Sequence, residues 1–204
     1  MTDSPSRPRA NRVRPDGAIV ADPARGLMMG NRGGRLTDAA GALRRRWASK
    51  AWICCEIAFR GRSKDVTGPG YTALFFLDEA TALAAGHRPC FACRRAEARA
   101  FAAAVAAGLG LAAPPRAAAL DARLHAERTG PRPEIDPATL PAGAMVAGGG
   151  GACLVASDGL RPWSFAGYGP PEPPPARARL LTPETTVAAF RAGYAPRRHP
   201  SALR

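Results

Sequence analysis

The sequence contains almost no lysine. Of its 29 basic residues only Lys50 and Lys64 are lysines, and the excess over 16 acidic residues gives a formal net charge of +13. The excess is concentrated near the start of the chain, where residues 1–64 carry 14 Lys/Arg against 5 Asp/Glu. Such a concentration of positive charge favours a polyanionic partner, nucleic acid above all, and the alternative is a basic tail that is simply solvated.

Long apolar runs are also absent. No stretch approaches the roughly 20 apolar residues that a membrane-spanning helix needs, which excludes that class. The basic residues do not lie on an amphipathic helix, so a membrane surface is not the expected partner. The first residues lack the apolar core of a secretory signal, and we therefore expect a cytoplasmic protein. No internal repeat is found, and repeat architectures are not expected.

Aromatic residues make up only 6% of the chain, whereas it contains 21 prolines and 22 glycines. This composition predicts many loops and short elements, and hence an α+β fold in preference to a helical bundle. We expect a disordered basic arm over residues 1–16, a metal-binding α+β domain over 17–130, and a module over 131–204 that packs on it.

Strands, helices and turns are predicted in an order that supports this division. Residues 52–59 and 71–76 have the β-propensity of strands. Asp78 is a suitable N-cap for a helix that ends before Gly86. In the last third, residues 144–147 and 152–156 predict a β-hairpin, and Thr182-Pro183-Glu184 predicts the start of a helix with the threonine as N-cap.

Cysteines provide the most specific chemical signal. Cys90 and Cys93 form a Cys-x-x-Cys turn, which lets two thiolates face one ion, and in a chain with no export signal such a turn favours metal over disulfide. A tetrahedral zinc site needs further ligands. Cys54 and Cys55 are adjacent on the predicted strand, so they point to opposite faces; the strand's alternation turns Cys55 inward and Cys54 outward.

The residues around this turn form a longer pattern. It comprises Phe75-Phe76, Glu79-Ala80, Ala84-Ala85-Gly86-His87-Arg88-Pro89-Cys90 and Cys93-Arg94. The pattern resembles the zinc-binding half of the N-terminal domain of the bacterial Ada DNA-repair protein, tightly over residues 71–95 and loosely over 50–95. The resemblance implies a small sheet with helices around a four-cysteine zinc, in a core expected at 48–109, and binding to DNA. In Ada one zinc thiolate also accepts a methyl group from a phosphotriester.

The resemblance implies Cys90 and Cys93 as one pair of ligands. The other pair in that family has the spacing Cys-x-x-x-Cys, but the residues four positions before and after Cys55 are Ala51 and Phe59, so only one cysteine of that pair is matched. Cys55 is the favoured third ligand. The fourth is left open among a small set of residues: Cys54, His87, His125 and Cys153. If none of them binds, the metal keeps an open position, and His125, one helical turn after Asp121, becomes a candidate general base of a hydrolase or nuclease.

Basic side chains near the metal motif are candidates for phosphate contacts. They are Arg44, Arg45, Arg46, Arg60, Arg62 and Lys64. A glycine-rich turn over 26–35 matches no phosphate-loop spacing, and we interpret it as a tight turn that presents Arg32 and Arg35.

The sequence therefore predicts a zinc protein that binds nucleic acid, and the resemblance to the Ada domain implies DNA in preference to RNA and a repair or modification context. A zinc-dependent hydrolase is one alternative. The other is a structural zinc module that binds a protein through the proline-rich segment 169–175.

Overall fold

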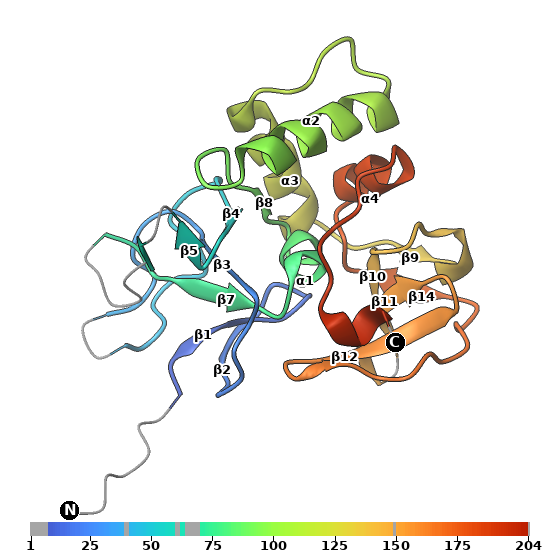
Figure 1. Cartoon of the computed structure of the whole chain (residues 1–204), viewed down its shortest axis with the longest axis horizontal. Helices are drawn as coiled ribbons and strands as arrows, with labels where there is room; N and C mark the ends of the chain where they lie inside the picture. Colours follow the sequence, from blue (N-terminus) through green and yellow to red (C-terminus); the bar gives the residue numbers. More distant parts are fainter. Residues whose placement is uncertain (1–7, 39–40, 60–61, 64–69, 149, 204) are drawn as a thin grey trace, which may run out of the picture.

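The computed structural model describes residues 8–38, 41–59, 62–63, 70–148 and 150–203. Two six-stranded sheets and several helices make up this part of the chain, which confirms the α+β class (Figure 1). The helices are α1 (Glu79–Ala84), α2 (Arg95–Leu109), α3 (Ala117–Thr129) and α4 (Glu184–Arg191), with 3-10 turns η1 (Pro137–Thr139) and η2 (Pro200–Leu203). None of the described helices is both long and apolar enough to span a membrane.

The first sheet is assembled from the N-terminal half and has the strand order β2-β1-β7-β3-β4-β8. Its strands are β1 (Ala10–Val13), β2 (Ile19–Ala21), β3 (Met28–Asn31), β4 (Ile53–Cys55), β7 (Leu74–Phe76) and β8 (Arg88–Pro89). The pairs β1–β7 and β4–β8 are parallel, and the other neighbours are antiparallel. A separate short hairpin joins β5 (Ala58–Phe59) to β6 (Arg62–Ser63).

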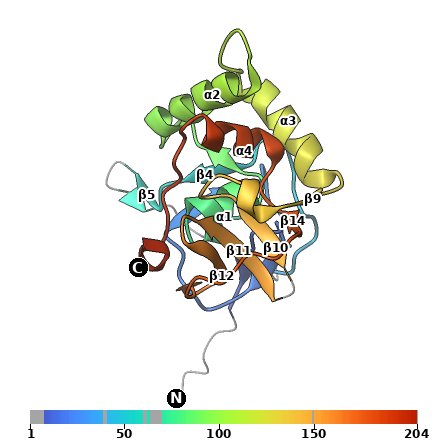
Figure 2. The same ribbon diagram turned by 90° about the vertical axis from the view of Figure 1, so that its right-hand side faces the viewer.

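The second sheet comes from the C-terminal third, with the order β13-β12-β11-β10-β14-β9. Its strands are β9 (Glu134–Ile135), β10 (Met145–Gly148), β11 (Gly151–Ala156), β12 (Gly159–Ser164), β13 (Gly167–Tyr168) and β14 (Ala178–Leu180). Pairing of β10 with β11 confirms the predicted hairpin. Figure 2 shows this sheet facing the viewer, with α2, α3 and α4 gathered at one end of the molecule.

Helix α1 lies between the two sheets, and all of its residues are buried (Figure 1). Ala82 packs into the core of the first sheet, whereas Ala84 packs beside Met145 of the second. Small side chains let both sheets approach this short helix closely. Because α1 contacts both halves, two clusters of buried apolar residues cross the boundary expected near residue 130.

The ends of α1 are as predicted. The carboxylate of Asp78 accepts a hydrogen bond from the backbone N–H of Thr81 at 2.8 Å, which makes it the N-cap. At the other end Gly86 has a φ of +84°, a conformation that glycine adopts without strain. A Cβ there would also lie 2.6 Å from the side chain of Arg128, so the position has room only for glycine.

Two local expectations were wrong. Residues 1–16 are not a disordered arm throughout, because Ala10–Val13 form β1, which pairs with β2 and, in parallel, with β7. Helix α4 forms where predicted, but Thr182 does not cap it. Its hydroxyl instead accepts a hydrogen bond from the backbone N–H of Met145 at 2.8 Å, which ties the helix start to the second sheet.

Candidate metal centre

Three cysteines meet where β4 and β8 end. Cys55 is the last residue of β4, Cys90 directly follows β8, and Cys93 lies in the turn before α2. Because β4 and β8 are parallel neighbours, their ends arrive at the same edge of the sheet, and the N–H of Cys90 donates to the carbonyl of Cys54 at 2.9 Å. The three Sγ atoms all lie within 4.8 Å of one another.

Backbone amides surround the sulfur atoms of this group. The N–H of Ala92 donates to Sγ of Cys90 at 3.4 Å, and the N–H of Glu56 donates to Cys93. A hydrogen bond from the thiol of Cys55, assisted by the N–H groups of Cys93 and Ala92, lowers the pKa of Cys90 to about 4 against the opposing effect of burial. The turn is thus built to hold a thiolate.

The donor set fits a thiophilic metal ion. A tetrahedral zinc with Zn–S bonds of about 2.3 Å places its sulfurs about 3.8 Å apart, which is within the spacing seen here. Cys55 and Cys90 are buried, while Cys93 is partly accessible. Cys55, Cys90 and Cys93 can therefore hold a metal ion, and among the residues that the structure describes no fourth His, Cys, Asp or Glu joins them.

Cys54, one of the candidates for a fourth ligand, belongs to the other face of the sheet. It packs with Leu74 and Phe76 beneath α1, whereas Cys55 packs with Met29 and Cys90. The alternation along β4 separates the two cysteines as predicted, but the outward orientation expected for Cys54 was wrong. This face of the sheet packs against α1, so Cys54 has no exposed surface, and burial raises the pKa of its thiol.

His87 is also placed away from the thiols. It has no exposed surface, its ring contacts Trp52 and Phe76, and its Nε2 accepts a hydrogen bond from Nε of Arg32 at 3.3 Å.

Arg32 and Arg128 cover the Trp52 ring, with guanidinium carbons 3.7 and 3.9 Å from ring centroids. Arg32 is thus fully buried and not presented by a surface turn as expected.

We expect His87 to make stability depend on pH. Burial, together with the positive charges of Arg32 and Arg128, lowers the pKa of His87 well below its usual value, so the folded protein keeps it neutral. The unfolded chain takes up this proton below about pH 6.5, and stability falls by up to about 1.4 kcal/mol per pH unit in that window. Replacing the histidine by an aromatic residue that cannot titrate should remove this dependence.

The measurement is urea unfolding of the wild type and of His87→Phe at about pH 7 and about pH 5.5. The variant should lose about 1 kcal/mol less than the wild type over this interval. Thiol titration affects both proteins alike and cancels in the comparison. Equal losses would show that His87 is protonated in the folded state.

The two remaining candidates lie on other elements. His125 is on α3, where its Nδ1 is 3.1 Å from a nitrogen of Arg128 and its ring contacts Trp47 edge-on. Cys153 lies on β11, opposite Val146 and Pro162. Neither joins the group of three thiols, and His125 is not placed to act on a metal-bound water there.

A buried ion-pair cluster adjoins the centre, and the sequence did not indicate it. Arg94, directly after Cys93, has no exposed surface in its side chain and pairs with Glu79 at 2.9 Å and with Glu56 at 3.4 Å. Its Nη1 also donates to Sγ of Cys54 at 3.6 Å. Glu79 in turn accepts hydrogen bonds from the hydroxyl of Tyr194 at 2.6 Å and the N–H of Arg197 at 2.9 Å.

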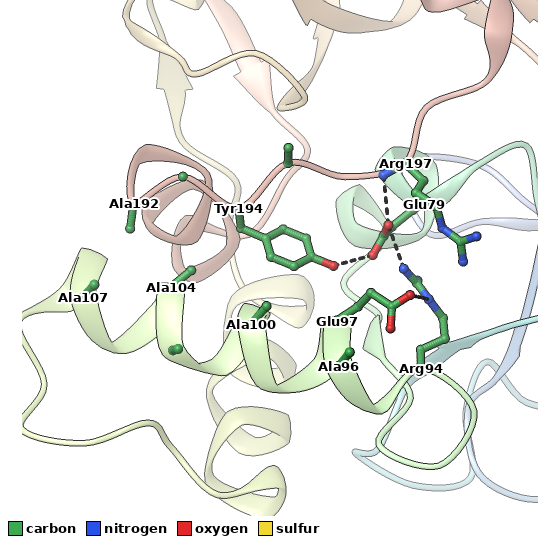
Figure 3. Close-up of a pocket in the computed structure, with 13 residues that line it drawn as sticks. Glu79, Arg94, Ala96, Glu97, Ala100, Ala104, Ala107, Ala192, Tyr194 and Arg197 are labelled. Carbon is green, nitrogen blue, oxygen red and sulfur yellow. Dashed lines mark hydrogen bonds and ion pairs between the residues drawn. The ribbon is translucent and has the colours of Figure 1, made fainter.

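Figure 3 shows Glu79, Arg94, Tyr194 and Arg197 converging at one end of a cavity of about 680 Å³ between α2 and the segment that follows α4. The cluster joins the metal-binding turn, α1 and the C-terminal segment. Because these partners lie far apart in the sequence, no local pattern predicts the cluster, although Arg94 itself belongs to the pattern that resembles the Ada domain.

The predicted phosphate-binding residues are only partly described. Arg44, Arg45 and Arg46 are exposed on one loop, whereas Arg60 and Lys64 lie outside the described residues, as does the side chain of Arg62. Trp47 and Trp52 anchor this loop with ring centroids 6.0 Å apart, and the carbonyl of Arg32 accepts from the N–H groups of Ala48 and Ser49. One of these arginines, Arg44, forms an ion pair with Asp38 at 2.8 Å.

Comparison of the chain with known protein families, with curated proteins and with solved structures gives no match. The function is therefore inferred from the geometry of this chain alone.

Proposed function

We propose that the chain is a zinc-binding protein that uses Cys55, Cys90 and Cys93 as ligands. The observation that supports the proposal is the approach of three sulfur atoms to within 4.8 Å of one another, from two neighbouring strands and a turn. Thiolates are soft ligands, which favours zinc over magnesium or calcium. When bound, the ion supplies a positive charge that compensates the three thiolates, and the amides of Ala92 and Glu56 share their remaining negative charge.

We further propose that the protein binds nucleic acid through the loop that carries Arg44, Arg45 and Arg46. All three side chains are exposed, and the buried contacts of Trp52 and Arg32 fix the loop that presents them. Arginine on a fixed loop suits phosphate because its guanidinium binds two phosphate oxygens at once. The resemblance to the Ada domain supports DNA in preference to RNA and a role in repair or modification.

Phosphate contacts of this kind predict a specific salt dependence. Each arginine that contacts a phosphate of duplex DNA contributes about 0.9 to the slope of log K against log salt concentration. Changing Arg44, Arg45 and Arg46 together to Gln should therefore reduce the slope by about 3 and weaken binding uniformly across sequences. Fluorescence anisotropy with labelled duplex and single-stranded DNA and with RNA, at several salt concentrations, measures both quantities.

The matched control removes the same charge elsewhere. Arg177, Arg179 and Arg191 are exposed on the C-terminal half, and their joint change to Gln should leave the slope nearly intact. Binding that is absent, insensitive to salt, or equally weakened in both triple variants would refute a nucleic-acid site on this loop.

A further inference from the structure

A second cavity opens on the same side of the first sheet as the metal centre. Its volume is about 760 Å³, within the range of small-molecule sites. It lies between β1, residues 22–26 before β3, and the face of the first sheet that carries Phe75. Its lining includes three arginines, one acid and two apolar residues: Arg9, Arg12, Arg25, Asp22, Ile57 and Phe75.

The charges in this cavity favour an anion. Arg9 and Arg25 are exposed, and neither side chain has a carboxylate partner among the described residues. Arg12 is held in place by hydrogen bonds from Nε to the carbonyl of Ala24 and from Nη1 to Asn11. Asp22 is the single acid of the lining, and one of its oxygens accepts from the N–H of Ala24 at 2.8 Å. The lining therefore contributes three positive charges against one negative charge.

The same cavity has an apolar part. The guanidinium carbon of Arg12 lies 5.0 Å from the centroid of the Phe75 ring, so the cation and the ring are presented together. Ile57 is 38% exposed, and it lines the cavity beside Phe75. Inorganic phosphate would leave this apolar surface in water, whereas an aromatic or aliphatic group would cover it.

The cavity and the metal centre are connected by one row of paired residues. Arg12 pairs with Phe75, Phe75 with Met29, and Met29 with Cys55, across the neighbouring strands β1, β7, β3 and β4 (Figure 1). Adjacent strands lie about 4.8 Å apart, which puts Phe75 about 10 Å from Cys55. Ile57 follows Cys55 by two residues. A ligand that contacts Phe75 would therefore lie on the same face of the sheet as the metal centre, about 10 Å from it.

We propose that this cavity binds a small organic anion, in which a phosphate or a carboxylate is attached to an aromatic or apolar group. The guanidinium groups of Arg12 and Arg25 hold the anion, and Phe75 and Ile57 contact the apolar group. Bidentate contact from arginine suits both anions, so their shared chemistry defines the ligand class. The site is separate from the arginine loop of residues 44–46 and does not depend on nucleic-acid binding.

Isothermal titration calorimetry of the metal-loaded protein tests this proposal with four probes: phenyl phosphate, benzoate, inorganic phosphate and phenol. Phenyl phosphate or benzoate should bind about tenfold tighter than both inorganic phosphate and phenol, because only these two probes carry both parts of the ligand. Whichever of the two binds tighter identifies the preferred anion.

Variants locate the binding. Arg25→Gln changes an exposed side chain and should weaken the better probe about threefold to tenfold without affecting folding, and Arg12→Gln should weaken it about tenfold or more. Phe75→Leu should reduce the advantage of the aromatic probe over inorganic phosphate. Arg14→Gln is the matched control, because Arg14 is exposed, follows β1 closely and is not part of the cavity lining.

Three results would overturn the proposal. They are the absence of binding of both organic anions at millimolar concentration, an affinity unchanged by Arg12→Gln and Arg25→Gln, and an affinity for the better organic anion no higher than that for inorganic phosphate.

Discussion

Removing the metal with a chelator is expected to lower the midpoint of thermal unfolding by roughly 10 °C. In the proposed site the ion would bind the native arrangement of Cys55, Cys90 and Cys93, which join β4, the turn after β8 and the start of α2. A ligand present at about 1,000 times its dissociation constant stabilises the native state by about 4 kcal/mol. For a chain of this size each kcal/mol changes the midpoint by about 2–4 °C.

Differential scanning calorimetry with and without chelator measures this change. Cys153→Ser should behave as the wild type does, because Cys153 lies on β11 away from the site. Cys90→Ser should already unfold at the lower temperature and should not respond to the chelator. If the wild type loses its metal without any change in midpoint, the ion does not stabilise the fold, and a reactive role becomes the better explanation.

Replacing Arg94 by methionine is expected to cost about 3–5 kcal/mol of unfolding free energy. The guanidinium is fully buried and pairs with Glu79, whose side chain is 1% exposed. Methionine fills much of the space but leaves the Glu79 carboxylate, among the described residues, with the hydroxyl of Tyr194 and the N–H of Arg197 as its hydrogen-bond donors. Removing one partner of a buried ion pair leaves an uncompensated charge, and this is the origin of the large cost.

Arg197→Met is the matched control for this variant. Arg197 also pairs with Glu56, but its side chain is 53% exposed, so we expect its loss to cost less than about 1 kcal/mol. Urea unfolding of both variants gives the comparison. Equal costs would mean that the buried pair contributes no more than a surface pair. A loss of metal in Arg94→Met would additionally show that the cluster supports the turn of Cys90 and Cys93.

The elements that the sequence predicted correctly are those with local signals. Helix α1 follows from the cap at Asp78 and the glycine at its end, and both act within a few residues. The turn of Cys90 and Cys93 is likewise local. The placement of Cys55 on the face opposite to Cys54 required only the alternation of side chains along a strand.

The features that could not be predicted depend on distant partners. Strand β1 pairs locally with β2, but it is joined to the rest of the sheet through β7, some sixty residues later in the chain. The burial of Arg32 depends on Trp52, His87 and the carbonyl of Gly17, none of which is its neighbour in sequence. A charged side chain normally predicts a surface position. Only the assembled fold shows that Arg32 and Arg94 have buried partners.

In the proposed metal centre three thiolates hold one metal ion. The most direct test is the metal content of the purified protein and of the five single Cys→Ser variants, measured by inductively coupled plasma mass spectrometry. We predict about one zinc per chain in the wild type, in Cys54→Ser and in Cys153→Ser, and almost none in Cys55→Ser, Cys90→Ser and Cys93→Ser. Zinc retained at wild-type level in Cys90→Ser or Cys93→Ser would contradict the account.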